Sequence, residues 1–132
     1  QERARQWGIH HVEVTGFQSE ERFRDWLFAV DLGIQLRVSP LLGVSGPLSD
    51  LAAFGTTAVA SRGLCVDVDP PAYVRPLPDS VSPVLVAEAV EAALEEPMSD
   101  VDREVLRRTY LAAKSPARYA EQLLAIIEKS IA

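Results

Sequence analysis

The residues best placed to bind a ligand lie where a loop of small residues leads into a short helix. Residues 45–50 read Ser-Gly-Pro-Leu-Ser-Asp, so Ser45 or Gly46 is the expected N-cap and Pro47 falls in the first turn, where a missing N–H costs nothing. The first N–H groups of a helix have no partner inside it and can hold phosphate oxygens. The sequence therefore predicts an anion site formed by the amides around Gly46 to Ser49.

Two charged side chains flank this helix start. Arg37 ends an apolar strand just before the loop and can pair with a phosphate, although a surface ion pair is an equally good explanation. Asp50 can accept hydrogen bonds from vicinal hydroxyls, as an acidic residue does with a ribose, and Gly55 is expected to end the helix in the left-handed conformation. The competing interpretation is an ordinary packing helix with a capped start and a surface carboxylate.

Strands and helices alternate around this stretch. Apolar alternation or a short β-branched run predicts strands over residues 11–15, 31–37, 56–61 and 73–78. Helical spacing and capping signals predict helices over residues 2–6, 19–30, 46–54, 83–94, 100–113 and from 116 onward, whereas residues 62–72 are expected to form a loop. This order predicts one α/β domain over residues 1–132, with a mostly parallel sheet and a helical C-terminal tail. Ligands bind beyond the carboxyl ends of the strands in such a sheet, where the loop after Arg37 must lie.

The apolar residues indicate the expected core. The helical spacing of four residues predicts one apolar helix face, formed by Phe23, Trp26, Leu27 and Val30. Trp7 and Trp26 are expected in the core rather than stacked on a sugar.

The distribution of charge limits the partners. The chain has 132 residues and a net charge of -6, and residues 38–98 contain only Arg62 and Arg75 against eight acidic residues. This balance argues against nucleic acid or an anionic membrane as the main partner. No apolar run has the length of a bilayer span, and no signal peptide opens the chain.

Cysteine and acidic motifs give little support for a metal. The single cysteine, Cys65, excludes an internal disulfide and a multi-cysteine zinc site, and a reducing, cytoplasmic setting is expected. Asp67-Val-Asp69 has the form of a metal-binding motif, but three residues beside two prolines are weak support for one. Neither a metal nor another cofactor is expected.

The order of these pieces resembles a known family. The resemblance is carried by the segments Val14–Phe17, Phe23–Arg37 and Ser45–Ser61, and it extends over nearly the whole chain. They resemble the carboxy-terminal domain of retaining glycosyltransferases of family 4, which have the two-domain GT-B architecture. The resemblance implies a Rossmann-like domain that binds a nucleoside-diphosphate sugar, so that the sugar is transferred to an acceptor.

The resemblance also implies a role for Asp50. In this family two acidic residues, with seven residues between them, are followed by a small residue and a glycine, and the second acidic residue contacts the ribose of the nucleotide. Asp50 lies five residues before Gly55 and matches that second position. The first position falls at or beside Leu42 to Val44, where no residue is acidic, so no catalytic residue is assigned.

The other residues of the implied donor site surround the diphosphate. Gly46, Pro47 and Leu48 match the turn that presents backbone amides to it. The full set of expected donor-binding residues is Arg37, Gly43, Ser45, Gly46, Pro47, Leu48 and Asp50.

The chain departs from the family at its start. The family's domain begins with two further strand–helix units, which carry a phosphate-binding Arg and Lys and supply strands between those of residues 11–15 and 31–37. We therefore expect a truncated domain that is inactive alone and that lacks its amino-terminal GT-B partner. The main alternative is a non-catalytic GT-B-like interaction module, and a nucleotide-sugar epimerase of the same architecture fits less well. Exposed strand edges also predict pairing with another chain, hence an oligomer.

Overall fold

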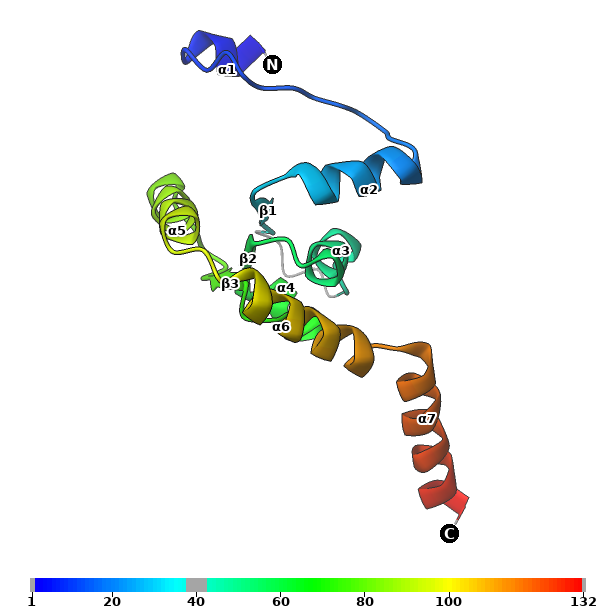
Figure 1. Cartoon of the computed structure of the whole chain (residues 1–132). Coiled ribbons are helices and arrows are strands. Elements are labelled where there is room, and N and C mark those ends of the chain that lie inside the picture. Colours follow the sequence, from blue (N-terminus) through cyan, green and yellow to red (C-terminus); the bar gives the residue numbers. More distant parts are fainter. Residues whose placement is uncertain (1, 38–42, 132) are drawn as a thin grey trace.

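The protein is built on a small parallel sheet. The computed structural model describes residues 2–37 and 43–131. Its strands are β1 (Gly33–Gln35), β2 (Ala58–Ser61) and β3 (Val74–Leu77), which lie side by side in that order and all run parallel. The predicted α/β fold with a parallel sheet and a helical C-terminal tail is confirmed (Figure 1).

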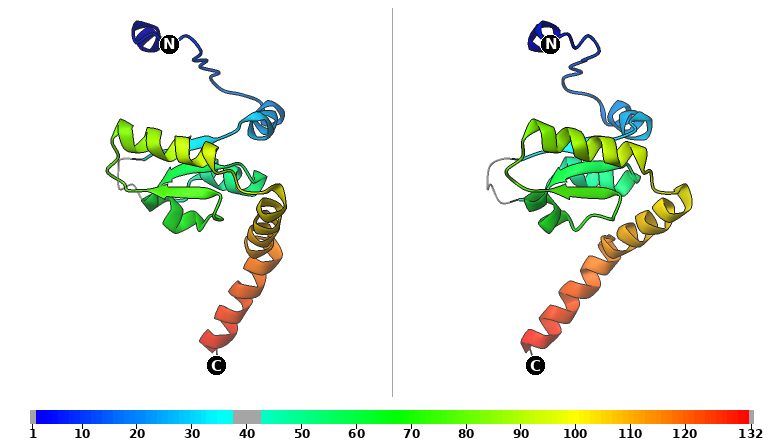
Figure 2. Two further views of the ribbon diagram at one scale, coloured as in Figure 1. Left: turned by 60° about the vertical axis from the view of Figure 1, so that its left-hand side comes forward. Right: turned by 90° about the vertical axis from the view of Figure 1, so that its left-hand side faces the viewer.

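Helices connect and cover the strands. They are α1 (Glu2–Gln6), α2 (Glu20–Ala29), α3 (Gly46–Phe54), α4 (Arg62–Val68), α5 (Pro83–Glu95), α6 (Asp100–Ala113) and α7 (Pro116–Ile131). Helix α5 lies on one face of the sheet and α4 on the opposite face (Figure 2). The open β1–β2–β3 order leaves β1 and β3 as edge strands.

Serine caps fix where most helices begin. The side chains of Ser19, Ser45, Ser82 and Ser99 each accept a hydrogen bond from the backbone N–H three residues later. This bond satisfies one of the N–H groups that the first turn of a helix leaves without a partner. The predicted starts of α2, α3, α5 and α6 are therefore confirmed. The predicted end of α3 is also confirmed, because Gly55 adopts φ 78°.

The hydrophobic core lies between the sheet and α3. Leu48 and Leu51 of α3 pack with Ala58 and Ala60 of β2 and with Leu27 at the end of α2. Each aliphatic side chain that is fully removed from water contributes about 1.5–3 kcal/mol. The threonine hydroxyl of Thr56 also donates a hydrogen bond to the carbonyl of Leu27 (3.0 Å), which joins α2 to the start of β2.

The expectation of a loop over residues 62–72 is wrong for its first part. Residues 62–68 form α4, and Leu64 and Val68 are buried in the core. These two residues are four apart and lie on one helix face, so their spacing carried the signal. The helix ends because Asp69 takes the left-handed conformation (φ 48°), which aspartate tolerates better than most residues.

The predicted strand over residues 11–15 is also wrong. These residues have no regular structure and are exposed, because none of the described strands pairs with them and a strand requires a partner. The prediction of buried tryptophans fails with it. Trp7 is exposed, and Trp26 keeps 39% of its surface accessible. Leu27 is the one residue of α2 that is buried.

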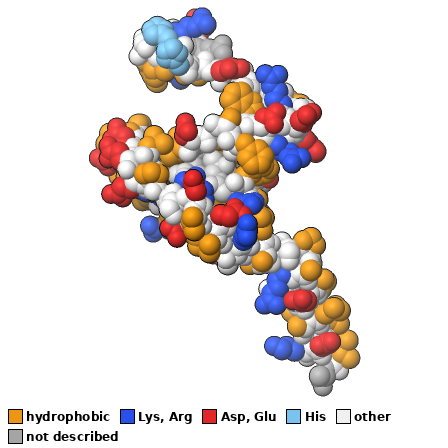
Figure 3. All heavy atoms as spheres, in the orientation of Figure 1, with side chains coloured by type: hydrophobic (Ala, Val, Ile, Leu, Met, Phe, Trp, Pro, Cys, Tyr) orange, Lys and Arg blue, Asp and Glu red, His pale blue; other side chains and the backbone are white. Residues whose placement is uncertain are grey.

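The C-terminal helices extend away from the sheet. Arg107 of α6 reaches the carbonyl of Ala53 in α3 (3.3 Å), and this contact holds α6 against the core. Helix α7 buries no side chain and projects outward (Figures 1 and 2), with apolar side chains along it open to solvent (Figure 3). The exposed apolar residues of this helix are Tyr119, Leu123, Leu124, Ile126, Ile127 and Ile131.

Candidate functional site

The carboxyl ends of the three strands define the candidate site. Since the strands are parallel, the residues that follow them lie at one edge of the sheet: Arg37 after β1, Ser61 at the end of β2 and Asp79 after β3. Helices α3, α4 and α5 begin in the chain just after these ends. Their N–H groups and their positive dipole ends favour negative charge at this edge.

A buried hydroxyl fixes the end of β1. The Ser61 side chain is almost fully buried, and its oxygen accepts a hydrogen bond from the Arg37 N–H (2.9 Å). The same hydroxyl donates to the Arg37 carbonyl (3.2 Å). Strand pairing between β1 and β2 ends at Gln35 and Ala60, so this side chain holds the backbone of Arg37 beyond the ladder.

The Arg37 side chain points to the loop before α3. Its Nη1 donates to the Gly43 carbonyl (3.3 Å). Gly43 has φ 146°, a conformation that L side chains rarely adopt, and the residue is exposed. The structure thus brings together two of the predicted donor-binding residues, while Leu42, the first residue considered for the missing acid, lies outside the described residues.

The start of α3 offers fewer amides than the sequence suggested. The Leu48 N–H donates to the Ser45 hydroxyl (3.3 Å), and the Ser49 N–H donates to the Ser45 carbonyl (2.9 Å). Pro47 has no N–H. Among the described residues, the N–H of Gly46 is therefore the one amide of this turn left without an acceptor. Of the amides expected to bind an anion, the Gly46 N–H is therefore the one available without breaking a hydrogen bond. A ligand that replaced the 3.3 Å bond between the Leu48 N–H and the Ser45 hydroxyl would add a second.

Leu48 has a structural role in addition. Its side chain is fully buried in the core, so only its backbone faces the helix start. Gly46 and Pro47 are exposed, and the space where a Cβ of Gly46 would stand is open.

Asp50 lies on a different side of α3. It follows the buried Leu48 by two residues, which places it about 200° around the helix and away from the sheet. Asp50 is half-buried and lies within electrostatic range of Tyr110 on α6. The Tyr110 pKa is raised, first by burial of the phenol and further by the carboxylates of Asp69 and Asp50, whereas a hydrogen bond with the Ser49 side chain acts against that rise.

One residue of this edge was not predicted. Asp79, two residues after β3, accepts a hydrogen bond from the Gly63 N–H at the start of α4 (2.8 Å). Burial raises the pKa of the nearby Cys65 thiol, and the Asp79 carboxylate raises it further, so the thiol form is favoured. The signal for Asp79 was its position directly after a strand of a parallel sheet.

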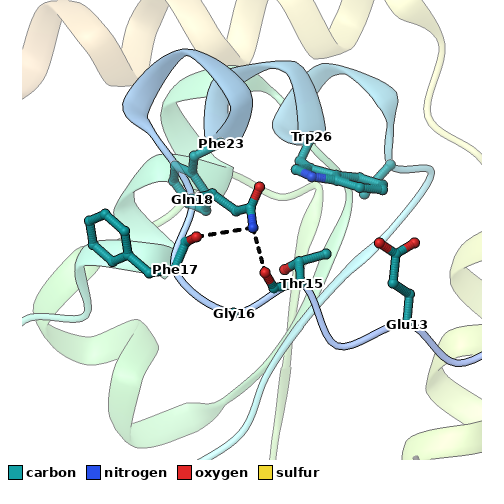
Figure 4. A pocket seen from close by; sticks show the side chains of 8 residues that line it. Glu13, Thr15, Gly16, Phe17, Gln18, Phe23 and Trp26 are labelled. Carbon is teal, nitrogen blue, oxygen red and sulfur yellow. Dashed lines mark hydrogen bonds between the residues drawn. The ribbon is translucent and has the colours of Figure 1, made fainter.

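An apolar hollow lies between α2 and the segment that precedes it, residues 13–18. It has a volume of about 660 Å³ and is lined mainly by Thr15, Phe17, Phe23, Trp26 and Val30. Figure 4 shows Gln18 bonding the carbonyls of Thr15 and Phe17 across its rim. A smaller hollow of about 190 Å³ shares Phe23, Trp26 and Val30 and continues along β1. The apolar face of α2 therefore lies beside β1, at the open edge of the sheet.

The open edge of β1 carries a backbone N–H that no described strand binds. Gly33 donates its N–H to the Thr57 carbonyl (2.8 Å), and Arg37 donates to Ser61, so both N–H groups point toward β2. Alternation along a strand then directs the N–H of Ile34 outward, where no described strand lies.

The described residues contain no cluster of three or more metal-ligating side chains. In the same ranges, no helix has both the length and the apolar character needed to cross a membrane. Comparisons with protein-family models, with curated proteins and with solved structures find no match to this chain.

Proposed function

We propose that the chain is the donor-binding domain of a retaining glycosyltransferase with the GT-B architecture. The observation that carries the proposal is Arg37, whose backbone is held just after β1 and whose side chain reaches the Gly43 carbonyl near the capped start of α3. An arginine and a helix N-terminus are complementary to a diphosphate. The resemblance of the sequence to family 4 supplies the class of substrate, a nucleoside-diphosphate sugar.

In this proposal the residues have separate tasks. Arg37 and the Gly46 amide bind the diphosphate, and Asp50 accepts hydrogen bonds from the ribose hydroxyls. Charge that develops on the departing diphosphate is stabilised by these preorganised groups, which is usually a large part of such catalysis. The acceptor is brought by an amino-terminal GT-B domain, and no metal is required. We place the protein in the cytoplasm, consistent with the free thiol of Cys65.

The test is donor binding by the protein. We expect UDP-glucose, GDP-mannose or ADP-glucose to bind in isothermal titration calorimetry, and Asp50→Ala to abolish that binding. Asp25→Ala, which removes an exposed carboxylate on α2, is the matched control and should bind as the wild type does. Equal donor affinity in Asp50→Ala and the wild type would refute the ribose role.

A second candidate is a non-catalytic interaction module of the same fold. It is favoured by Gly43 and Val44, which stand where the family has an acidic residue. The backbone of Gly43 (φ 146°) is also unsuited to a side chain. If no nucleotide sugar binds and a partner protein co-purifies through this edge of the sheet, the module is the better description.

A further inference from the structure

One buried hydroxyl of the sheet has no role in the function proposed so far. Ser61 is 1% exposed, and its hydroxyl both accepts from and donates to the backbone of Arg37, with distances of 2.9 and 3.2 Å. A hydroxyl has one donor and two acceptor sites, so this arrangement uses its capacity to bind one residue twice. The bonded groups lie just beyond the last β1–β2 pair.

Two hydrogen bonds to one backbone unit restrict where its side chain can emerge. The Arg37 guanidinium meets the Gly43 carbonyl (3.3 Å), two residues before the N-cap Ser45. A guanidinium carries five N–H donors in a fixed plane and can bind a carbonyl and an anion together. Its direction therefore decides whether an anion at the start of α3 meets it.

We propose that Ser61 is a positioning residue for the diphosphate of the donor, acting through Arg37. The proposal rests on the function proposed above and adds to it: Ser61 does not touch the ligand but fixes the arginine that does. The hydroxyl holds the Arg37 backbone so that the guanidinium and the Gly46 amide face the same anion. The ligand class is a diphosphate, because two donors from separate elements suit two linked phosphates better than one carboxylate.

The chain offers a matched control two residues before the opposite end of β2. Thr56 is also buried, and its hydroxyl donates to the Leu27 carbonyl (3.0 Å), far along the strand from the site. Thr56→Val removes that hydroxyl while keeping the shape of the side chain. Ser61→Ala and Thr56→Val should therefore lower stability to a similar extent, and only Ser61→Ala should change anion binding.

The experiment measures binding of inorganic pyrophosphate by isothermal titration calorimetry to the whole chain. We expect Ser61→Ala, which removes both hydrogen bonds to the Arg37 backbone, to weaken the affinity about fivefold to tenfold. Thr56→Val should bind as the wild type. In an Arg37→Ala background, Ser61→Ala should cause no further loss, because the arginine through which it acts is gone.

Each outcome decides the proposal. Unchanged affinity in Ser61→Ala, or a loss that persists in the Arg37→Ala background, overturns it, and a wild type that still outbinds Arg37→Ala leaves the proposed function standing. If the wild type does not bind pyrophosphate, the proposed phosphate site and the role of Ser61 in binding fall together. Hydrogen exchange of the Arg37 amide then separates the geometry from the function: faster exchange in Ser61→Ala supports the bond itself, and unchanged exchange refutes it.

Discussion

The phenol of Tyr73 donates a hydrogen bond to the backbone carbonyl of Ala52, which joins the residue before β3 to the last turn of α3. Two arginines of α6 bind the neighbouring carbonyls: Arg107 reaches Ala53 (3.3 Å) and Arg103 reaches Gly55 (3.5 Å). The last carbonyls of a helix have no partner within it, and cationic side chains there also offset its dipole. Helix α3 is therefore held firmly at the end away from the candidate site.

Loss of the Tyr73 hydroxyl should destabilise the fold. Tyr73 is buried, so Tyr73→Phe leaves the Ala52 carbonyl with only the long hydrogen bond from the Gly55 N–H (3.4 Å), at a cost of about 0.5–1.5 kcal/mol. Urea unfolding followed by circular dichroism measures this change. Tyr119→Phe, on the exposed α7, is the matched control and should change the free energy of unfolding by less than about 0.5 kcal/mol.

The same tyrosine makes stability fall in alkali. Burial raises the pKa of Tyr73 from 10.0 to about 12, while coulombic contributions from nearby charged groups partly cancel. Because the folded-state pKa lies above the unfolded one, the contribution is complete below pH 10 and is lost as the pH rises toward 12. Unfolding midpoints measured between pH 9 and 12 should fall steeply in the wild type and less steeply in Tyr73→Phe. Parallel curves for the two proteins would contradict this assignment.

Acid should weaken the ion pairs that Glu104 makes within α6. Glu104 accepts hydrogen bonds from Arg107 (2.8 Å) and Arg108 (2.7 Å), and these bonds lower its pKa from 4.5 to about 2. A lowered carboxyl pKa means that the contribution is present above pH 4.5 and is lost as the pH falls toward 2. A carbon-detected NMR titration should place the midpoint of the Glu104 carboxyl well below 4.5. In Glu104→Gln, stability should depend less on pH in this window, and an unaltered acid transition would argue against the ion pair.

The glycines at the two ends of α3 should respond in opposite directions to substitution by alanine. Gly55 has φ 78°, and a Cβ there would stand 3.0 Å from the Arg107 side chain, so Gly55→Ala should cost about 1–2 kcal/mol. Gly46 is the first residue of α3 and has open space around its Cβ position, so Gly46→Ala should be neutral or stabilising by up to about 1 kcal/mol. Thermal unfolding of the two variants compares them directly. A destabilised Gly46→Ala would contradict the open space found around its Cβ position.

The open edge of β1 should make the isolated chain associate with itself. Ile34 is 47% exposed, and its outward N–H and the apolar face of α2 beside it suit a further strand. Light scattering after size exclusion should show species larger than a monomer at micromolar concentration. Ile34→Lys should shift them toward monomer, because a charged edge side chain opposes strand pairing. The same substitution at an exposed residue of α7, Ile127→Lys, tests whether the helix tail is responsible instead.

Local chemistry could be predicted from the sequence in this protein. The serine before each of the five capped helices, α7 with Ser115 included, and the glycine after α3 act within a few residues, so their effects are visible in the chain order. The buried strand β2 was also predicted, because a β-branched apolar run has few alternatives in an α/β chain.

What depends on distant partners could not be predicted. Residues 11–15 alternate as a strand does, yet alternation does not supply the neighbouring strand that the backbone requires. The amides of α3 were counted as available, although the predicted N-cap Ser45 already implied that its hydroxyl accepts one of them. The bond between Ser61 and Arg37 joins residues 24 apart, and nothing in the local pattern of either residue indicates it.

The projecting ends of the chain determine how the protein should respond to heat and denaturant. Helices α1 and α7 bury no side chain, so melting them exposes little surface that water did not already reach. Heat-capacity change and denaturant sensitivity both scale with newly exposed surface. The unfolding transition should therefore report on α2 to α6 alone, with a heat-capacity increment of about 1.1–1.4 kcal/mol/K rather than the roughly 1.6–2.0 kcal/mol/K of a uniformly packed chain of this length. By its heat-capacity increment, the protein should resemble a packed domain of about 90 residues.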